Sequence, residues 1–273
     1  MITSNPFAAL TEFIPAATMQ AYVVAMLILV VAGTIFDVIH KRSKEYFDGY
    51  TREMAKKARR RVDNKTGLLV KTVTNEVLTS SEFKNPKRRV SHLLTMYGFI
   101  FFVASTAVLI FAYPGQADAG IWSILWHLGA LMLCIGGYWF WFGIRVDVYA
   151  EGVRWYELEF RRDVFILGML SMCTFALIWS FTGSMLMFAL FIASSTILFS
   201  TVIWSKFAHM FFKPAAAYQK KVIWADGSRE NLPDIPDLSS AEVKEKFPDI
   251  PTYMGENPPY MGLGIKREPP RHY

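Results

Sequence analysis

The chain has 273 residues, of which 53% are hydrophobic, 15% aromatic and only 19% charged. It is too apolar for an ordinary soluble enzyme or a disordered chain, yet too charged to lie wholly within a membrane. The two cysteines, Cys134 and Cys173, both fall in apolar runs, so the sequence offers no disulfide framework and no cysteine motif for zinc or an iron–sulfur cluster. We therefore expect an all-α polytopic membrane protein with sizeable aqueous segments.

Five apolar runs are each long enough to cross a hydrocarbon core of about 30 Å as a helix. Their interiors contain no Lys, Arg or Glu, and their sole acid is Asp37. A lone strand would leave its backbone polar groups unpaired in lipid, so these runs predict five transmembrane helices. In chain order the runs are Met19–Ile39, Leu93–Tyr113, Ile121–Ile144, Val164–Phe181 and Met185–Trp204.

The distribution of Lys and Arg predicts the orientation of these helices. All 29 of these cations lie in residues 41–91, 145–163 and 206–273, and none lies in the segments on the opposite side. The positive-inside rule therefore predicts that the N-terminus is outside and the C-terminus is cytoplasmic. No basic segment precedes the first run, so we expect no cleaved signal peptide. The expected parts are a periplasmic N-terminus (1–18), a five-helix membrane domain (19–213) and a cytoplasmic tail (214–273).

The two largest aqueous segments each allow two interpretations. The basic loop 41–91 opens with an amphipathic spacing that indicates an extension of the first helix near the lipid headgroups, and its cations suit either anionic lipid or a partner protein. Nucleic acid is not expected, because the cations lie where the topology requires them. The tail 214–273 holds nine of the 13 prolines and one short helical stretch near 239–247. This tail either docks on a cytoplasmic partner or is disordered.

The histidines are the residues of this sequence that best indicate its chemistry. His92 begins the second predicted helix and His209 ends the fifth, so both are expected at the same cytoplasmic depth. Two imidazoles from different helices can bind the iron of a haem b from opposite faces, and neighbouring Lys and Arg suit its propionates. Alternatively, each is an interfacial anchor. His127, near the outer end of the third predicted helix, is either a quinone partner or proton carrier, or a neutral histidine bonded to a neighbouring helix.

Three segments are similar to those of a known family: Arg88–Phe99, Arg162–Gly183 and Trp204–Met210. They resemble the five-helix haem b subunits related to the gamma subunit of respiratory nitrate reductase. Within that superfamily, the nearest branch holds the membrane anchor of adenylylsulfate reductase of sulfur-oxidising bacteria and the membrane subunit of the quinone-interacting oxidoreductase complex. The tail segment Asn257–Glu268 looks most like the former, and this chain lacks the cysteine-rich iron–sulfur domain of the latter.

The resemblance implies two haems across the membrane, each held by histidines of the second and fifth helices. His92 and His209 match the cytoplasmic pair, whereas the outer pair would fall near Phe102 and Phe191, which cannot bind iron. We therefore expect one haem b at most. The implied function is electron transfer between the quinone pool of a bacterial inner membrane and a cytoplasmic flavin/iron–sulfur oxidoreductase, adenylylsulfate reductase. The chemistry on sulfur would belong to that partner, and no catalytic residue is expected here.

Two questions stay open at this level. The quinone site would use His127 if it is outer, or His40 and Asp37 if it lies near the inner face. The function would reduce to that of a haem-free membrane anchor if the chain only docks the soluble enzyme, and the missing outer pair favours this alternative. A transporter is disfavoured, because no predicted helix is broken, no internal repeat is visible and few polar residues lie in the runs.

Overall fold

The computed structural model describes residues 2–40, 43–81, 83, 85–147, 152–228 and 241–246. Apart from one isolated bridge between Ser4 and Asp118, these residues form helices, turns and loops. The α-helices are α1 (Ala16–His40), α2 (Ser43–Lys56), α3 (Lys65–Thr72), α4 (Pro86–Phe111), α5 (Ile121–Trp139), α6 (Phe160–Thr182), α7 (Met185–Ser200), α8 (His209–Ala225) and α9 (Ala241–Lys246). Short 3-10 or π turns are η1 (Ala9–Glu12), η2 (Val73–Leu78), η3 (Phe140–Ile144) and η4 (Lys206–Ala208).

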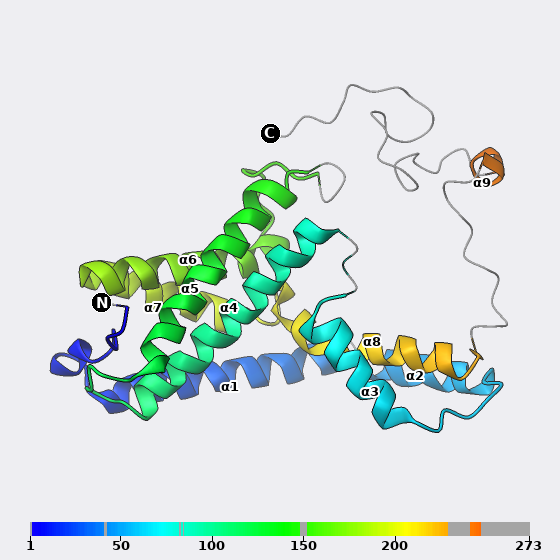
Figure 1. Cartoon of the computed structure of the whole chain (residues 1–273), viewed down its shortest axis with the longest axis horizontal. Coiled ribbons are helices and arrows are strands. Elements are labelled where there is room, and N and C mark those ends of the chain that lie inside the picture. The colour runs from blue at the N-terminus through cyan, green and yellow to red at the C-terminus, as the bar shows by residue number, and fades with distance from the viewer. Residues whose placement is uncertain are drawn as a thin grey trace.

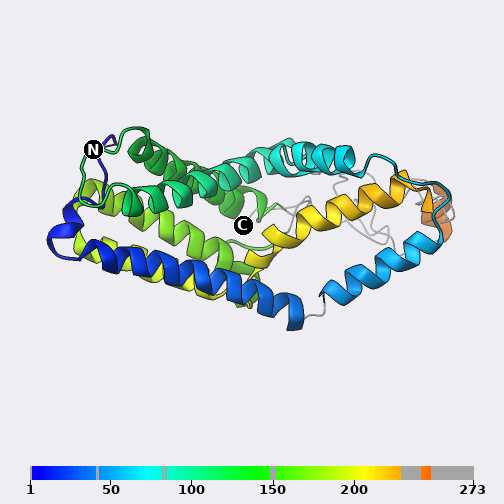
Figure 2. The ribbon, with the colours of Figure 1, turned by 90° about the horizontal axis from the view of Figure 1, so that it is seen from below.

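Helices α1, α4, α5 with η3, and α6 are each long and apolar enough to span a membrane. They confirm the first four predicted spans, and with α7 they form the bundle in Figures 1 and 2. We call the end of this bundle that carries His40, Pro86, Ile144 and Phe160 the basic end, and the end that carries Ala16 the N-terminal end. Residues near the N-terminus fold onto the latter, because the Asn5 amide donates hydrogen bonds to the carbonyls of Tyr113 and Gln116.

The fifth predicted span is only partly helical. Helix α7 has 16 residues and ends at Ser200 instead of Trp204; at 1.5 Å per residue it is about 24 Å long. The Thr201 hydroxyl donates to the Ile197 carbonyl at 2.7 Å at this end of the helix. The Ser205 hydroxyl then accepts from the Phe207 amide at 3.2 Å as the next helical turn begins. The prediction that His209 ends the fifth helix is therefore wrong, because His209 begins the separate helix α8.

Helix α8 also changes the expected boundary of the tail. It continues through Pro214 to Ala225, so the first residues of the tail are helical. Together with α2 and α3 it forms an extension beyond the basic end of the bundle, which Figure 2 shows in profile. Gln219 donates to the Phe47 carbonyl at 3.2 Å, and Lys221 pairs with Glu76 at 3.0 Å. Helix α9 confirms the short helix expected near 239–247, whereas residues 247–273 lie outside the described part of the chain.

Glycines hold α4 and α5 close together. A Cβ added to Gly129 would lie 2.5 Å from the Phe102 amide nitrogen, and one added to Gly98 would lie 2.8 Å from the amide nitrogen of Leu133. At Gly136 the α4 hydroxyl of Ser91 donates to the α5 carbonyl at 2.8 Å. Lipid supplies no hydrophobic drive between helices, so close backbone approach and interhelical hydrogen bonds carry the association.

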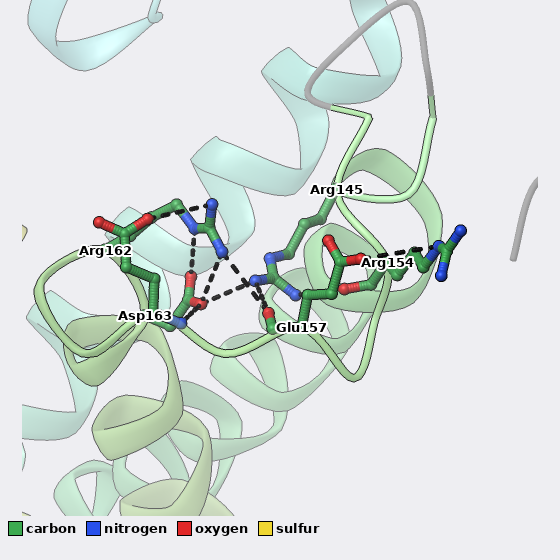
Figure 3. A network of polar contacts seen from close by, with 6 residues as sticks. Arg145, Arg154, Glu157, Arg162 and Asp163 are labelled. Carbon is green, nitrogen blue, oxygen red and sulfur yellow. Dashed lines mark hydrogen bonds and ion pairs between the residues drawn. The ribbon is translucent and has the colours of Figure 1, made fainter.

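A buried ion pair fixes the connection between α5 and α6 at the basic end, as Figure 3 shows. Arg145 donates to Asp163 at 2.7 Å, and their side chains are 1% and 4% exposed. Arg145 also donates to the carbonyls of Arg154 and Glu157 and lies 3.9 Å from the ring centroid of Trp141. These partners replace the water that the buried guanidinium loses. Hydropathy does not reveal this pair, because its members are 18 residues apart, Arg145 just after η3 and Asp163 in α6.

We expect Gly129→Ala to destabilise the bundle. Its added methyl meets backbone atoms that cannot rotate away, and such overpacking costs about 1–3 kcal/mol. Thermal unfolding in detergent, followed by the near-ultraviolet signal of the tryptophans, measures the loss. Gly49→Ala on α2 is the matched control, because a Cβ there meets nothing within 4 Å. Equal midpoints for the two variants would contradict the packing described for α4 and α5.

We also expect Arg145→Met to destabilise the bundle, because it removes the fully buried partner of Asp163; the cost should stay below the roughly 3–5 kcal/mol of an unpaired buried charge, since Arg162 still pairs with Asp163 at 3.0 Å. The double variant Arg145→Met/Asp163→Leu should recover most of that loss, since it leaves no buried charge. Arg154→Met is the control, because this side chain is 44% exposed in a 3.6 Å ion pair with Glu157. The same thermal measurement applies, and a double variant no more stable than Arg145→Met alone would contradict the account.

Candidate functional site

A cavity of about 270 Å³ at the basic end contains His92 in its wall. It lies between η2, α4, α6 and α8, and we call it the His92 cavity. Most of its wall is apolar, and His92, Glu76 and Lys213 supply its titratable groups. The remaining lining residues are Val77, Thr95, Met96, Phe99, Ile100, Phe165, Met169, Met210, Pro214 and Ala217.

The ring of His92 is held by two contacts. Its Nδ1 lies 3.0 Å from the Ser80 hydroxyl, and the Phe83 ring packs on it with a centroid separation of 4.9 Å. Ser80 is 1% exposed and has φ +48°. It is the one residue other than glycine with a positive φ in the described chain, a strained conformation that is common at functional sites. The hydrogen bond orients the imidazole through Nδ1, so Nε2 would be the nitrogen that ligates a metal.

Helix α4 holds the loop that carries Ser80. The Tyr97 hydroxyl donates to the Leu78 carbonyl at 2.7 Å, and Arg89 donates to the Thr79 carbonyl at 2.7 Å. His92 lies on the same helix between these two donors. Arg89, His92 and Tyr97 of α4 therefore all hydrogen-bond to the short loop 78–80. The position of this loop depends on the register of α4.

The sequence at the start of α4 fixes that register. Asn85 caps the helix by accepting from the amides of Lys87 and Arg88 at 2.9 and 3.3 Å, and Pro86 occupies the first helical position. One turn later Ser91 bonds to the Gly136 carbonyl on α5. His92 is the next residue, so its backbone is anchored to the bundle on one side while its side chain faces the cavity.

The donor set of the His92 cavity fits a haem b. An imidazole that is oriented by a second hydrogen bond is a common axial ligand, and thioethers can serve as the second one. Met96, Met169 and Met210 line the wall, and Lys213 supplies a cation for a propionate. Sequence reasoning found His92 but missed the three methionines; the four-residue spacing of His92 and Met96 on one helix face was a signal for the first of them.

His209 is the residue expected to bind the haem iron together with His92, and the structure describes only its backbone. His209 begins α8, one residue before Met210 in the cavity wall. The side chain of His209 lies outside the described residues, so the predicted pair of axial histidines stays a prediction.

The positions of the outer haem pair face each other but hold aromatic rings. Phe102 on α4 and Phe191 on α7 are buried, with ring centroids 6.1 Å apart in an edge-on arrangement. Trp126 packs on Phe102 at 5.1 Å, and Trp179 stacks on Phe191 at 6.0 Å. The structure brings together the two places named from the sequence and fills them with side chains that cannot ligate iron.

The three candidate residues for a quinone lie at opposite ends of the bundle. His127 is 4% exposed near the N-terminal end, with Nδ1 at 2.7 Å from the Ser123 carbonyl and Nε2 at 2.7 Å from the Ser180 hydroxyl. Both ring nitrogens thus have protein partners. At the basic end His40 is exposed and stacks on Phe36, whereas Asp37 is 1% exposed. None of the three lines the His92 cavity.

Comparisons with known proteins give no further constraint on this site. No family model, no curated protein and no solved structure matches this chain.

Proposed function

We propose that this chain is a haem b membrane subunit that transfers electrons between the quinone pool and a cytoplasmic flavin/iron–sulfur oxidoreductase, with adenylylsulfate reductase as the partner. The observation that carries the proposal is His92, an imidazole oriented by Ser80 in the wall of a largely apolar cavity. A haem held there would supply a one-electron iron couple. The chain's own residues would ligate the iron, cover the macrocycle with apolar side chains and neutralise a propionate through Lys213.

The proposed setting is a bacterial inner membrane with the basic end in the cytoplasm. Every Lys and Arg of the sequence lies in the segments that join the helices at this end or in the tail. In this arrangement α7 is a fifth, short crossing, completed by the segment after Ser200. The extension formed by α2, α3 and α8 then projects into the cytoplasm, where the soluble partner would dock beside the His92 cavity.

We place the quinone headgroup near His40 and Asp37 rather than near His127. His40 and Asp37 lie at the same end of the bundle as the His92 cavity, which shortens the electron path. His127 already has protein partners at both ring nitrogens. A quinone at His127 would have to displace the Ser123 carbonyl or the Ser180 hydroxyl from a buried ring.

One observation favours the second candidate function, a haem-free anchor. Helix α8 leaves the bundle and joins α2 and α3 in a folded extension, as a docking surface requires. A pure anchor needs this extension but no oriented histidine. The buried Ser80–His92 contact at a left-handed residue is therefore the feature that separates the two candidates.

We expect His92→Ala to abolish the visible absorbance of a haem b in the purified chain, because it removes an axial bond. Haem per chain, from the reduced-minus-oxidised spectrum, should fall at least roughly tenfold, the lower bound for losing a metal ligand's supporting contact. His40→Ala is the control for haem content, because its exposed imidazole lies outside the cavity. A wild-type chain without haem would favour the anchor, and a His92→Ala chain with full haem content would contradict the proposed ligand.

The topology makes a separate prediction. Reporter fusions after Gly115, in the turn between α4 and α5, and after Lys244 should report opposite compartments. The positive-inside rule places the first outside and the second in the cytoplasm. A periplasm-active phosphatase and a cytoplasm-active fluorescent protein, fused at each position in turn, provide complementary signals. The same compartment for both positions would contradict the five-crossing arrangement.

A further inference from the structure

The two cysteines of the chain meet inside the bundle. Cys134 on α5 and Cys173 on α6 are 39 residues apart in sequence, yet their Sγ atoms lie 3.2 Å from each other. Both are free thiols. Each lies near the middle of its spanning helix, since those spans are Ile121–Ile144 and Phe160–Thr182.

The packing of α5 on α6 lets these thiols approach. Gly137, one turn after Cys134, faces Leu170, one turn before Cys173, and a Cβ on this glycine would lie 2.6 Å from the Leu170 Cδ2. The Leu170 side chain therefore lies against the backbone of α5 one turn from the thiol pair. A disulfide needs an S–S distance of about 2.05 Å, which requires the sulfurs to close by about 1.2 Å. Side-chain rotation supplies a movement of this size.

A short polar chain leads from the thiols to the surface of the bundle. The Cys134 Sγ lies 3.7 Å from the Thr174 hydroxyl, which lies 2.9 Å from the hydroxyl of Tyr138. Tyr138 is 40% exposed, and Leu131 and Ile135 on the neighbouring part of α5 are 49% and 50% exposed. Cys134 itself is half-buried beside this lipid-facing stripe. A proton can thus leave Cys134 through two hydroxyls, and a molecule dissolved in the lipid can reach the thiol.

We propose that Cys134 and Cys173 form a redox-active dithiol that a lipid-soluble quinone oxidises to an intramembrane disulfide. Cys134, as its thiolate, adds to the quinone ring and forms a C–S bond. Cys173, as its thiolate, attacks the Cys134 sulfur, so that the S–S bond forms and the C–S bond breaks. The electron pair stays on the ring, which takes up the two thiol protons as quinol. The protein is oxidised by two electrons and the quinone is reduced by two.

The position of Cys134 and Cys173 within the membrane determines which oxidants can reach them. Glutathione disulfide and protein disulfides are charged or bulky and do not enter the hydrocarbon layer, whereas quinones dissolve in it. The site shares no lining residue with the His92 cavity and requires no haem. The inference therefore goes beyond the proposed function, and either can fail without the other.

The test uses the full chain in liposomes under anaerobic conditions, with decylubiquinone as the probe. Its fully substituted ring allows the transient C–S bond of the proposed step but cannot rearomatise to a stable thioether. After denaturation, maleimide mass-tagging should count two free thiols in the reduced chain and none after quinone treatment, and intact mass should fall by two hydrogens. Dithiothreitol should restore both thiols. Cys134→Ser and Cys173→Ser should each keep their remaining thiol under quinone, which separates an internal disulfide from a link between chains.

Tyr138→Phe tests the proton path and should slow disulfide formation on the order of 10-fold, at or below the lower end of general acid–base contributions. Phe142→Leu is the control, because the Phe142 ring stacks on Tyr138 with a centroid separation of 6.2 Å but carries no hydroxyl; it should leave the rate unchanged. Two thiols that persist under saturating quinone would overturn the proposal. So would a disulfide that forms with diamide but not with the quinone, because the pair would then be close but not quinone-linked.

Discussion

The close approach of α4 and α5 is the constraint on which the rest of this molecule depends. Gly98 and Gly129 face each other at one level of the contact and Gly136 lies at a second, and none of the three leaves room for a side chain. Ser91 adds a hydrogen bond to the Gly136 carbonyl at the second level. In lipid, such contacts replace the hydrophobic effect as the source of helix association. Because His92 follows Ser91, the packing of α4 on α5 also determines where the His92 imidazole lies. It determines in the same way how the side chains of α4 contact the loop at Ser80.

Charge at the basic end is divided between a buried and an exposed part. Arg145 and Asp163 are buried and join the end of η3 to the start of α6, so this pair shapes the bundle. The exposed cations lie mainly on α2, on the segment after it and on α8. They are where a membrane surface or a soluble partner would meet the chain. The buried pair thus contributes to the fold, whereas the exposed cations remain accessible.

Local sequence predicted the four long helices, because each apolar run is uniform over at least 18 residues. It failed after Ser200, where hydropathy stays high to Trp204 although α7 ends. It also failed at Pro214, which was interpreted as the start of an irregular tail although α8 continues through it. In both places hydropathy or a proline predicted a boundary that the backbone hydrogen bonds of the helices do not follow. The amino-acid composition of the segment does not indicate this difference.

The candidate site could be predicted only in part, because its residues come from several elements of the chain. His92 is visible as a polar residue at the start of an apolar run, but Ser80 and Met169 reach the same place from other elements, and only packing reveals that. The contact between Cys134 and Cys173 needs the rotation and register of α5 against α6, which a single sequence does not contain. Phe102 and Phe191 were paired correctly because equal depth on antiparallel helices follows from rise per residue alone.

The central claim is that the His92 cavity holds a single redox centre. Electron paramagnetic resonance of the oxidised wild-type chain, purified in mild detergent and compared with its protein concentration, tests this most directly. The account predicts a low-spin ferric haem signal that integrates to one spin per chain. A chain without any ferric haem signal would contradict it, and so would a signal of two spins per chain, because the aromatic cluster around Phe102 and Phe191 leaves no ligands for a second haem.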